Sequence, residues 1–360
     1  MNAVDAQHTD VIILFGGESA EHDVSCVTAA HVLRSLDPLR YRITTVGITR
    51  AGKWVLASDA TKSLAAGALS LPERLVAAGE PTSITPIIEQ VRTDKNTVVL
   101  PLLHGPMGED GTVQGVLELA NVAYVGSGVL GSAVAMDKGV AKQLLASKNI
   151  AQPNFVSLRD GFVTEAVISS AVEKLGLPVF VKPANMGSSI GVSKARTIDE
   201  VRSAITHALS FDEWVLIEEA IDGREIEVAI LGNLEPRASV PGEIIPSHEF
   251  YDYEDKYLVD GAALIVPARL STAQISEVQQ KAIEIFKILR ADGMARVDFL
   301  YEENGRGFLC NEINTIPGFT PISMYPKLWQ ASGLTYSQLL DELISLAIER
   351  HGRQRRNTQR

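Results

Sequence analysis

The stretch ARVDFLYEENGRGFLCNEINTIPGFT, residues 295–320, is the most informative part of the chain. Residues 297–301 and 308–313 are rich in the apolar and aromatic side chains that are typical of β-strands. The sequence Glu-Asn-Gly-Arg-Gly between them consists of turn-forming residues centred on Gly305. The stretch therefore predicts a β-hairpin.

Four polar side chains interrupt the apolar pattern of this hairpin. A turn centred on Gly305 places Asp298 opposite Glu312 and Arg296 opposite Asn314. Residues two apart on a strand share a face, so all four can project to one side. Carboxylate and amide oxygens suit Mg²⁺ and the phosphates it binds, and an arginine suits an anion held by the metal. A solvated hairpin face is the alternative that this segment alone leaves open.

The composition is that of an ordinary folded protein. The chain has 360 residues, 46% hydrophobic and 21% charged, so two or three domains are expected. A net charge of −11 argues against a nucleic-acid partner. Only residues 351–360 are basic, and we expect them to be a frayed, disordered tail.

Cysteine use and the N-terminal sequence indicate a cytoplasmic protein. Cys26 and Cys310 lie in apolar segments and lack the spacing of a disulfide framework or a zinc site. Residues 1–10 lack the basic and long apolar regions of a secretory signal. No apolar run approaches the roughly 20 residues needed to span a bilayer, so we expect no membrane insertion.

Strand and helix signals alternate in the first third of the chain. Buried strands are predicted at residues 11–15, 41–49 and 97–103, a helix at 22–36, and a further apolar stretch at 112–120. This alternation predicts a parallel sheet with helices on its faces.

The later segments predict two further units, and we place the domains at 1–127, 128–220 and 221–360. A long polar connection spans residues 247–262, and such connections are usually functional or disordered. The elements predicted after the first unit are helices near 137–148, 197–209, 273–290 and 335–350, a strand ending at Lys182, and a strand at 214–218.

A loop with two glycines, residues 187–191, follows the strand that ends at Lys182. It leads into another strand, whereas a Walker loop runs into a helix. Its amides and hydroxyls can still surround phosphate oxygens. Glu218 and Glu225 can meet a purine and a ribose, which favours nucleotide binding over a plain turn.

The loop after the first strand carries Glu18, Glu21 and Asp23 at a predicted helix start. Helix N-termini attract anions, but three carboxylates favour a cation such as a substrate ammonium group. The alternative is that these acids only complement the helix dipole. His104 follows a strand at an edge where α/β sheets bind ligands, although a lone histidine is more often structural.

These motifs together resemble one family. The chain resembles the D-alanine–D-alanine ligases of the ATP-grasp superfamily, from GGESAEHDVS through LHGPMGEDGTVQG, YVGSGVLGSAVAMDK, VFVKPANMGSSIGVSK, GREIEVAILG, EFYDYEDKYL and ARVDF to NEINTIPGFTPISMYP. So many motifs in order make coincidence implausible. The resemblance implies an ATP-grasp fold, in which an N-terminal parallel-sheet domain precedes central and C-terminal α+β domains that sandwich ATP.

The resemblance implies which residues bind the nucleoside of ATP. Glu218 and the backbone from Glu219 to Ile221 would hold the adenine edge, and Glu225 would hold the ribose. Lys182 would lie near the adenine and also contact the phosphates. Some relatives carry lysine where this chain has Glu219.

The phosphates and metals would be bound beside the nucleoside. Lys138 would contact the phosphates, and Ser188 and Ser189 would close over them. Met186 replaces a glutamate found in some relatives. The residues matching the family's ligands for two Mg²⁺ (or Mn²⁺) ions are Asp298, Glu312 and Asn314. A K⁺ requirement stays open.

The implied reaction converts the carboxylate of a first D-alanine to an acyl phosphate, which the amine of a second D-alanine attacks. Glu21 would hold the first ammonium group, with His104 near the carboxylate. Arg296 and the N–H of Gly318 would form the oxyanion hole. The carboxylate of the second D-alanine would be bound by Ser323 and the N–H of Met324.

The segment 247–262 matches the family's ω-loop lid. Tyr257 would hydrogen-bond to Ser188, Ser188 to Glu21, and Lys256 would reach the γ-phosphate. The intact YDYEDKY pattern favours the dipeptide over D-alanyl-D-lactate. A homodimer is also expected from the resemblance.

Two other functions compete with this interpretation. One is a depsipeptide ligase or another ATP-grasp carboxylate–amine ligase with a different acceptor. The other is a nucleotide-binding module or oxidoreductase, which predicts Gly-x-Gly-x-x-Gly after the first strand. Residues 16–21 read Gly-Gly-Glu-Ser-Ala-Glu and do not fit.

Overall fold

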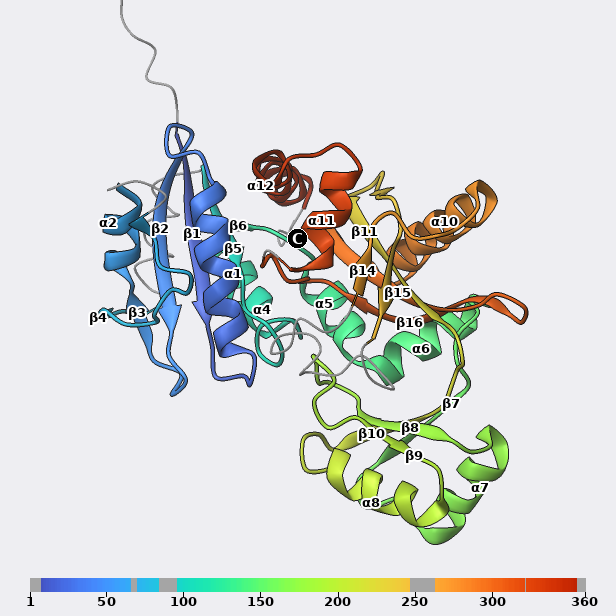
Figure 1. Cartoon of the computed structure of the whole chain (residues 1–360). Coiled ribbons are helices and arrows are strands. Elements are labelled where there is room, and N and C mark those ends of the chain that lie inside the picture. Colours follow the sequence, from blue (N-terminus) through green and yellow to red (C-terminus); the bar gives the residue numbers. More distant parts are fainter. Residues whose placement is uncertain (1–7, 66–69, 84–95, 247–262, 321, 355–360) are drawn as a thin grey trace, which may run out of the picture.

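The computed structural model describes residues 8–65, 70–83, 96–246, 263–320 and 322–354, arranged around three sheets (Figure 1). The strands are β1 Thr9–Gly16, β2 Tyr41–Ile48, β3 Trp54–Leu56, β4 Glu80–Pro81, β5 Thr97–Pro101, β6 Ala123–Tyr124, β7 Phe155–Arg159, β8 Val179–Pro183, β9 Ser193–Ala195, β10 Trp214–Glu219, β11 Arg224–Gly232, β12 Arg237–Ala238, β13 Gly242–Ile245, β14 Ala263–Ile265, β15 Gly293–Glu302 and β16 Gly307–Asn314. The helices are α1 His22–Ser35, α2 Ser58–Ala65, α4 Thr112–Leu119, α5 Val129–Met136, α6 Lys138–Ser147, α7 Glu165–Leu175, α8 Ile198–Ala208, α10 Thr272–Ile288, α11 Met324–Ala331 and α12 Tyr336–Arg353.

The first sheet has the strand order β4-β3-β2-β1-β5-β6. Its β2-β1-β5-β6 part is parallel, as predicted, and β3 and β4 add an antiparallel edge. Val11 and Ile13 pack into one apolar core, while Ile12 and Leu14 pack into another. Because β1 is buried on both faces, its sequence is continuously apolar and does not alternate.

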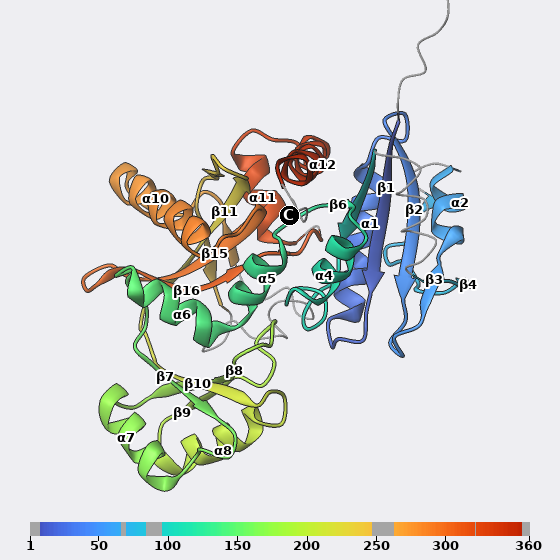
Figure 2. The same ribbon diagram turned by 180° about the vertical axis from the view of Figure 1, so that it is seen from behind.

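The second and third sheets are antiparallel. The second has the order β7-β10-β8-β9 and, with α7 and α8, forms the lobe at the bottom of Figures 1 and 2. The third has the order β14-β13-β11-β15-β16, with β12 beside β11. Ala135 of α5 and Leu145 of α6 belong to the core of the third sheet, although the predicted range 128–220 groups both helices with the second.

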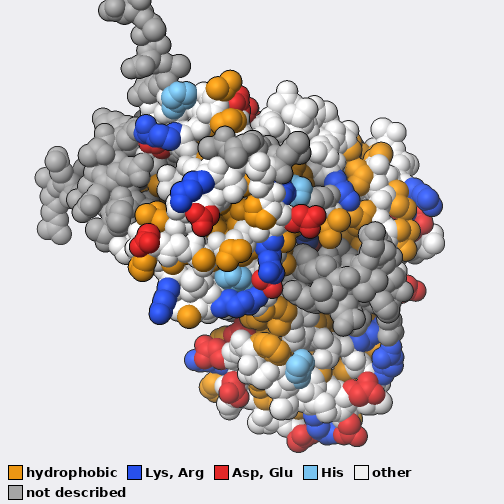
Figure 3. Space-filling view, turned by 60° about the vertical axis from the view of Figure 1, so that its left-hand side comes forward, with side chains coloured by type: hydrophobic (Ala, Val, Ile, Leu, Met, Phe, Trp, Pro, Cys, Tyr) orange, Lys and Arg blue, Asp and Glu red, His pale blue; other side chains and the backbone are white. Residues whose placement is uncertain are grey.

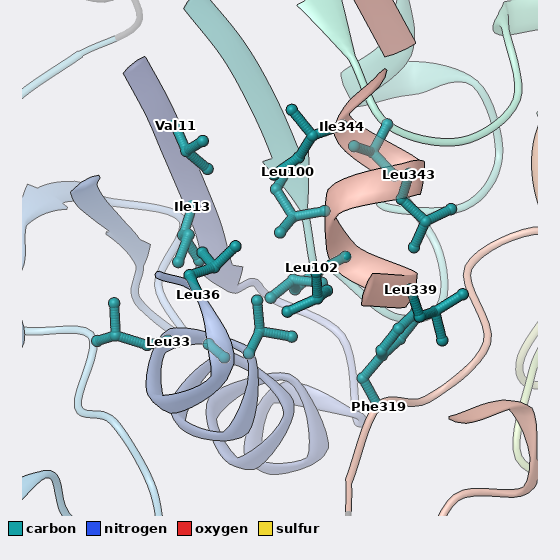
Figure 4. Close-up of a cluster of buried hydrophobic side chains, with 14 of the residues drawn as sticks. Val11, Ile13, Leu33, Leu36, Leu100, Leu102, Phe319, Leu339, Leu343 and Ile344 are labelled. Carbon is teal, nitrogen blue, oxygen red and sulfur yellow. The ribbon is translucent and has the colours of Figure 1, made fainter. Parts of the chain in front are cut away.

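The last helix returns to the first sheet. Leu339, Leu343 and Ile344 of α12 share one buried cluster with Val11 of β1 and Leu100 of β5 (Figure 4). Residues separated by most of the chain therefore belong to one hydrophobic core. This packing fixes the N-terminal unit against the C-terminal one.

Two sequence predictions about the chain's ends and helices need correction. Residues 351–353 are not a frayed tail: α12 continues through Arg353, whose Nη2 lies 2.8 Å from Asp292 Oδ1. Helices α2, α5, α7 and α11 were not predicted, because short segments carry little periodic signal. Both cysteines are buried and free.

The surface agrees with the composition. On the face drawn in Figure 3, Lys and Arg side chains lie among Asp and Glu side chains, without the continuous basic stripe that tracks a nucleic-acid backbone. Among the described residues, no helix combines the length and apolar character that a bilayer crossing requires.

We expect Leu343→Ala to destabilise the protein strongly. Leu343 is 1% exposed in the shared core, and truncating such a side chain costs about 2–5 kcal/mol of unfolding free energy. Urea denaturation would measure the loss. Leu119→Ala is the matched control, because Leu119 is 90% exposed, and equal midpoints for the two variants would contradict the shared core.

Candidate active site

The hairpin β15–β16 has the predicted register. Arg296 pairs with Asn314, and Asp298 pairs with Glu312. The register shifts after Asp298, so Asn311 is an extra residue between Glu312 and Cys310, the partner of Phe299. This β-bulge keeps the polar residues aligned on one face while the turn itself closes one residue tighter.

Arg296 lies at the centre of an acidic row. Its Nε is 2.7 Å from Asp298 Oδ1, and its Nη2 is 2.6 Å from Asp298 Oδ2. Its Nε also lies 3.1 Å from Glu227 Oε1. Burial opposes the charge, but these carboxylates outweigh it and raise the pKa of Arg296, so the guanidinium stays charged.

Sequence reasoning missed Glu227. It is 4% exposed, and strand register places it opposite Asp298, which faces Glu312 on the next strand. The available signal was its position two residues after Glu225 on one strand, which puts both on the same face. Glu227, Asp298 and Glu312 therefore form a row of three carboxylates, one on each of three adjacent strands.

Asp298, Glu312 and Asn314 supply only oxygen ligands, which fits Mg²⁺ or Mn²⁺. Among the described residues, no group of three or more His, Cys, Asp and Glu side chains is already arranged to hold a metal ion. Asp298 is engaged by Arg296, and Lys138 Nζ lies 3.7 Å from Glu312 Oε2. A bound metal ion would take the place of Arg296 and Lys138 as the positive charge beside these two carboxylates.

Glu21 joins the N-terminal unit to the loop after β8. The Ser188 hydroxyl donates to Glu21 Oε1, as the family resemblance implied. A Cβ at Gly187 would lie 2.9 Å from Glu21 Oε2, so the loop backbone approaches this carboxylate closely. Ser188 and Ser189 have φ values of 50° and 59°, a left-handed conformation that is costly for non-glycine residues and recurs at ligand sites.

The other two carboxylates of this loop do not face the site. Asp23 pairs at the surface with Arg50 and Arg74, at 2.8 and 3.2 Å. Glu18 is exposed and lies against Gly52. The idea that three acids bind one cation is therefore wrong, and only Glu21 remains for that role.

His104 is 4% exposed and bonded through both ring nitrogens. Its Nδ1 lies 3.3 Å from Glu109 Oε1, and its Nε2 lies 3.4 Å from Thr28 Oγ1. Burial disfavours the imidazolium, but the hydrogen bond and charge of Glu109, with the charge of Glu21, raise the pKa of His104 above its ordinary value. Sequence reasoning missed Glu109, although it lies in the quoted LHGPMGEDG motif.

The start of α11 forms another wall. Ser323 Oγ accepts the N–H of Thr320 at 3.0 Å and makes no cap bond to the helix. The first N–H groups of α11, including that of Met324, are thus available to an anion. A Cβ at Gly318 would lie 2.7 Å from Ser323 Oγ, so a larger residue at this position would displace the Ser323 hydroxyl.

The segments described above together line a cavity of about 100 Å³. The predicted residues that line it are Glu21, His104, Lys138, Ser188, Arg296, Glu312, Asn314, Gly318, Ser323 and Met324. They come from all three units, so the site exists only in the assembled fold.

A second cavity, of about 710 Å³, lies between the second and third sheets. The predicted residues that line it are Lys138, Lys182, Ser188, Ser189, Glu218, Glu219, Ile221, Glu225, Arg296, Asp298 and Glu312. The two cavities share Lys138, Ser188, Arg296 and Glu312, so they meet at the hairpin.

Glu218 is held by two lysines at the back of the larger cavity. Its Oε2 is 2.5 Å from Lys182 Nζ, and its Oε1 is 3.0 Å from Lys142 Nζ. Burial alone would raise the pKa of Glu218, but the two ammonium groups outweigh burial and lower it. Lys142 was missed, although it follows Lys138 by one helical turn.

Glu219 lines the larger cavity, and its carboxylate is engaged by two neighbouring groups. It accepts the Asn154 N–H at 2.6 Å and pairs with Arg306 at 2.6 Å, which ties β10 to the β15–β16 turn. Lys256, Tyr257 and the whole segment 247–262 lie outside the described residues.

The arrangement of this cleft defines a class of protein. Two antiparallel α+β units enclose a nucleotide-sized cavity, with lysines on one side and an oxygen-rich hairpin on the other, which is the ATP-grasp architecture. Two family models divide the chain between them: D-ala D-ala ligase N-terminus matches residues 10–127, and D-ala D-ala ligase C-terminus matches residues 144–345. The chain belongs to the D-alanine–D-alanine ligase family.

Individual relatives agree along nearly the whole chain. A D-alanine–D-alanine ligase of Heliobacterium modesticaldum is 44% identical over 353 residues, covering 96% of each chain. The solved D-alanine–D-alanine ligase of Coxiella burnetii is 36% identical with a TM-score of 0.80, covering 96% of this chain and 95% of that one. The VanG D-Ala:D-Ser ligase of Enterococcus faecalis is 35% identical with a TM-score of 0.82, covering 95% and 100%.

We expect Glu109→Gln to lower the pKa of His104. The amide cannot supply the charge that holds the imidazolium, while burial still opposes it. NMR titration of the histidine ring would show the imidazolium lost at lower pH than in the wild type. Glu18→Gln is the control, because Glu18 is exposed, and an unchanged His104 titration in Glu109→Gln would refute the pairing.

Proposed function

We propose that this protein joins two D-alanine molecules to D-alanyl-D-alanine, with conversion of ATP to ADP and phosphate, for peptidoglycan precursor synthesis. The observation that carries the proposal is the junction of the two cavities at Lys138, Arg296 and Glu312. A phosphoryl donor in the larger cavity can there meet a small acceptor in the smaller one. Holding both partners in one geometry is a large part of such catalysis.

The larger cavity would bind ATP. Glu218, Glu219, Ile221 and Glu225 line this cavity. Glu218 and the backbone from Glu219 to Ile221 would bind the adenine edge, and Glu225 would bind the ribose. Lys182 would serve both the base and the phosphates. A cavity of about 710 Å³ is within the range of small-molecule sites.

The phosphates would extend toward the hairpin. Lys138 and the hydroxyls of Ser188 and Ser189 would bind their oxygens. The residues proposed to hold the metal are Asp298, Glu312 and Asn314. Bound Mg²⁺ or Mn²⁺ would neutralise charge on the transferring phosphoryl group. Two ions and a K⁺ requirement remain proposals from the resemblance.

The smaller cavity would bind the first D-alanine. Glu21 would accept its ammonium group, and a protonated His104 would hold its carboxylate close to the phosphoryl donor. Both side chains are buried, which strengthens their electrostatic interaction with a ligand. The Ser188–Glu21 hydrogen bond would keep the carboxylate in place.

The second D-alanine would enter beside α11. Ser323 and the N–H of Met324 would bind its carboxylate, so its neutral amine can attack the acyl phosphate. Arg296 and the N–H of Gly318 would stabilise the oxyanion of the tetrahedral intermediate. Arg296 would have to exchange its Asp298 contact for this oxyanion as the metal takes Asp298.

Further features of the protein are proposed on the resemblance. Tyr257 and Lys256 would belong to a lid over the acyl phosphate, which hydrolyses readily if water enters. The three-part division at 127 and 220, a homodimer and a cytoplasmic location are proposed on the same ground.

A different second substrate is the one alternative to the proposed function that a specific observation favours. The VanG structure, of a D-Ala:D-Ser ligase, is similar to this chain at a TM-score of 0.82. We propose D-alanine as the preferred acceptor because the YDYEDKY pattern is intact.

The purified protein should release ADP and phosphate with Mg²⁺, ATP and D-alanine. A coupled ADP assay with D-alanine alone, L-alanine alone, and D-alanine plus D-lactate or D-serine would test this, with mass spectrometry of the products. The dipeptide should dominate. ADP release that does not depend on D-alanine would exclude the proposed ligase, and a dominant ester or D-alanyl-D-serine would move the preference to that acceptor.

Glu312→Gln should lower kcat by at least about 100-fold while the fold survives, because the amide is a much weaker metal ligand. Coupled ADP release would measure kcat, and circular dichroism would check the fold. Glu303→Gln is the matched control, since Glu303 is exposed in the turn of the same hairpin. Near-full turnover of Glu312→Gln would remove the metal role.

A further inference from the structure

Lys142 is a charged residue that no ligand in the two cavities can touch. Its side chain is 2% exposed, and it lines neither cavity. It projects from α6 to Glu218 Oε1 at 3.0 Å, with the ring centre of Phe155 at 5.7 Å. Burying an ammonium group is costly unless it has a specific partner, so this placement calls for a role.

Lys182 holds the same carboxylate from the other side. Its Nζ is 2.5 Å from Glu218 Oε2, but Lys182 and Glu218 both line the larger cavity. A ligand there can reach these two residues and cannot reach Lys142. The two lysines are therefore not equivalent: one is available to a ligand, and the other stays with Glu218.

A bound nucleotide changes the charge balance around Glu218. If phosphates or the base take the ammonium group of Lys182, one of the two cations that hold Glu218 is shared or lost. The charged groups facing Glu218 are Lys142 from α6 and Lys182 from β8, and its neighbours in strand register are Phe155 and Phe180. Lys142 alone then offsets the cost of a buried carboxylate.

We propose that Lys142 is the resident counter-ion that keeps Glu218 ionised when a nucleotide occupies Lys182, and thereby sets the preference for a purine with a 6-amino group over one with a 6-oxo group. This inference rests on the proposed binding of ATP. Lys142 acts through Glu218, so it is a positioning residue and touches no substrate.

The preference follows from hydrogen-bond chemistry. An ionised carboxylate only accepts, so it pairs with the 6-amino group of adenine and repels the 6-oxo group of hypoxanthine or guanine. A protonated carboxyl can donate to that oxo group. Burial favours the protonated form of Glu218. Without its counter-ion, Glu218 would therefore no longer distinguish a 6-amino purine from a 6-oxo purine.

Lys142→Met keeps the length and apolar stem of the side chain and removes its charge. Isothermal calorimetry with ADP and with IDP, at pH 7 in two buffers of different ionisation enthalpy, gives affinities and protons taken up. The wild type should bind ADP without proton uptake. Lys142→Met should take up close to one proton per ADP, and its ADP-to-IDP affinity ratio should fall by about tenfold or more.

Two further variants separate positioning from simple damage. Lys148→Met is the matched control, because Lys148 is exposed at the end of the same helix, and it should behave as wild type. In a Glu218→Gln background, Lys142→Met should not change the ADP-to-IDP ratio further. Lys142→Met with no proton uptake and a ratio within about twofold of wild type would overturn the proposal.

A measurement on the wild type covers the case in which Lys142→Met does not fold. The carboxyl ¹³C signal of Glu218 in the ADP complex at pH 7 reports its charge, and a protonated Glu218 would overturn the inference. Failure of the proposed function is seen separately, as absence of D-alanine-dependent ADP release. A wild type that binds neither ADP nor IDP would overturn both.

Discussion

The register of β11, β15 and β16 is the constraint on which the site depends. It places Glu227, Asp298 and Glu312 in one row across adjacent strands, and like charges so close together repel. The row is stable because cations are built into it: Arg296 lies between two of the carboxylates, and Lys138 is near the third. A row of carboxylates that needs cations beside it would also suit the binding of a metal ion that carries phosphates.

The rest of the molecule brings other segments to this row. Packing of α12 on the first sheet joins the N-terminal and C-terminal units in one core, and that core carries Glu21 and His104 to the hairpin. The Ser188–Glu21 hydrogen bond then links the second sheet to the first unit. Three regions of the chain thus complete one cavity, and none of them contains the site by itself.

Part of the site could be predicted because its geometry is local. The Gly-rich turn near Gly305 and the two-residue repeat of a strand are enough to pair Asp298 with Glu312, although the Asn311 bulge that preserves this pairing was not foreseen. Glu227 and Lys142 were missed for the opposite reason. A buried acid or lysine has the same sequence appearance as an exposed one, and only its partners reveal its burial.

The sequence by itself determined the central strands, the longer helices, the family and the chemical types gathered at the site, because these follow from periodicity, turn residues and ordered motifs. Tertiary structure decided which charges face each other. It turned Asp23 to surface arginines, brought Glu21 but neither Glu18 nor Asp23 to the smaller cavity, and placed Glu218 between Lys142 and Lys182. Electrostatic contacts between distant segments depend on how cores pack, and packing is a property of the whole fold.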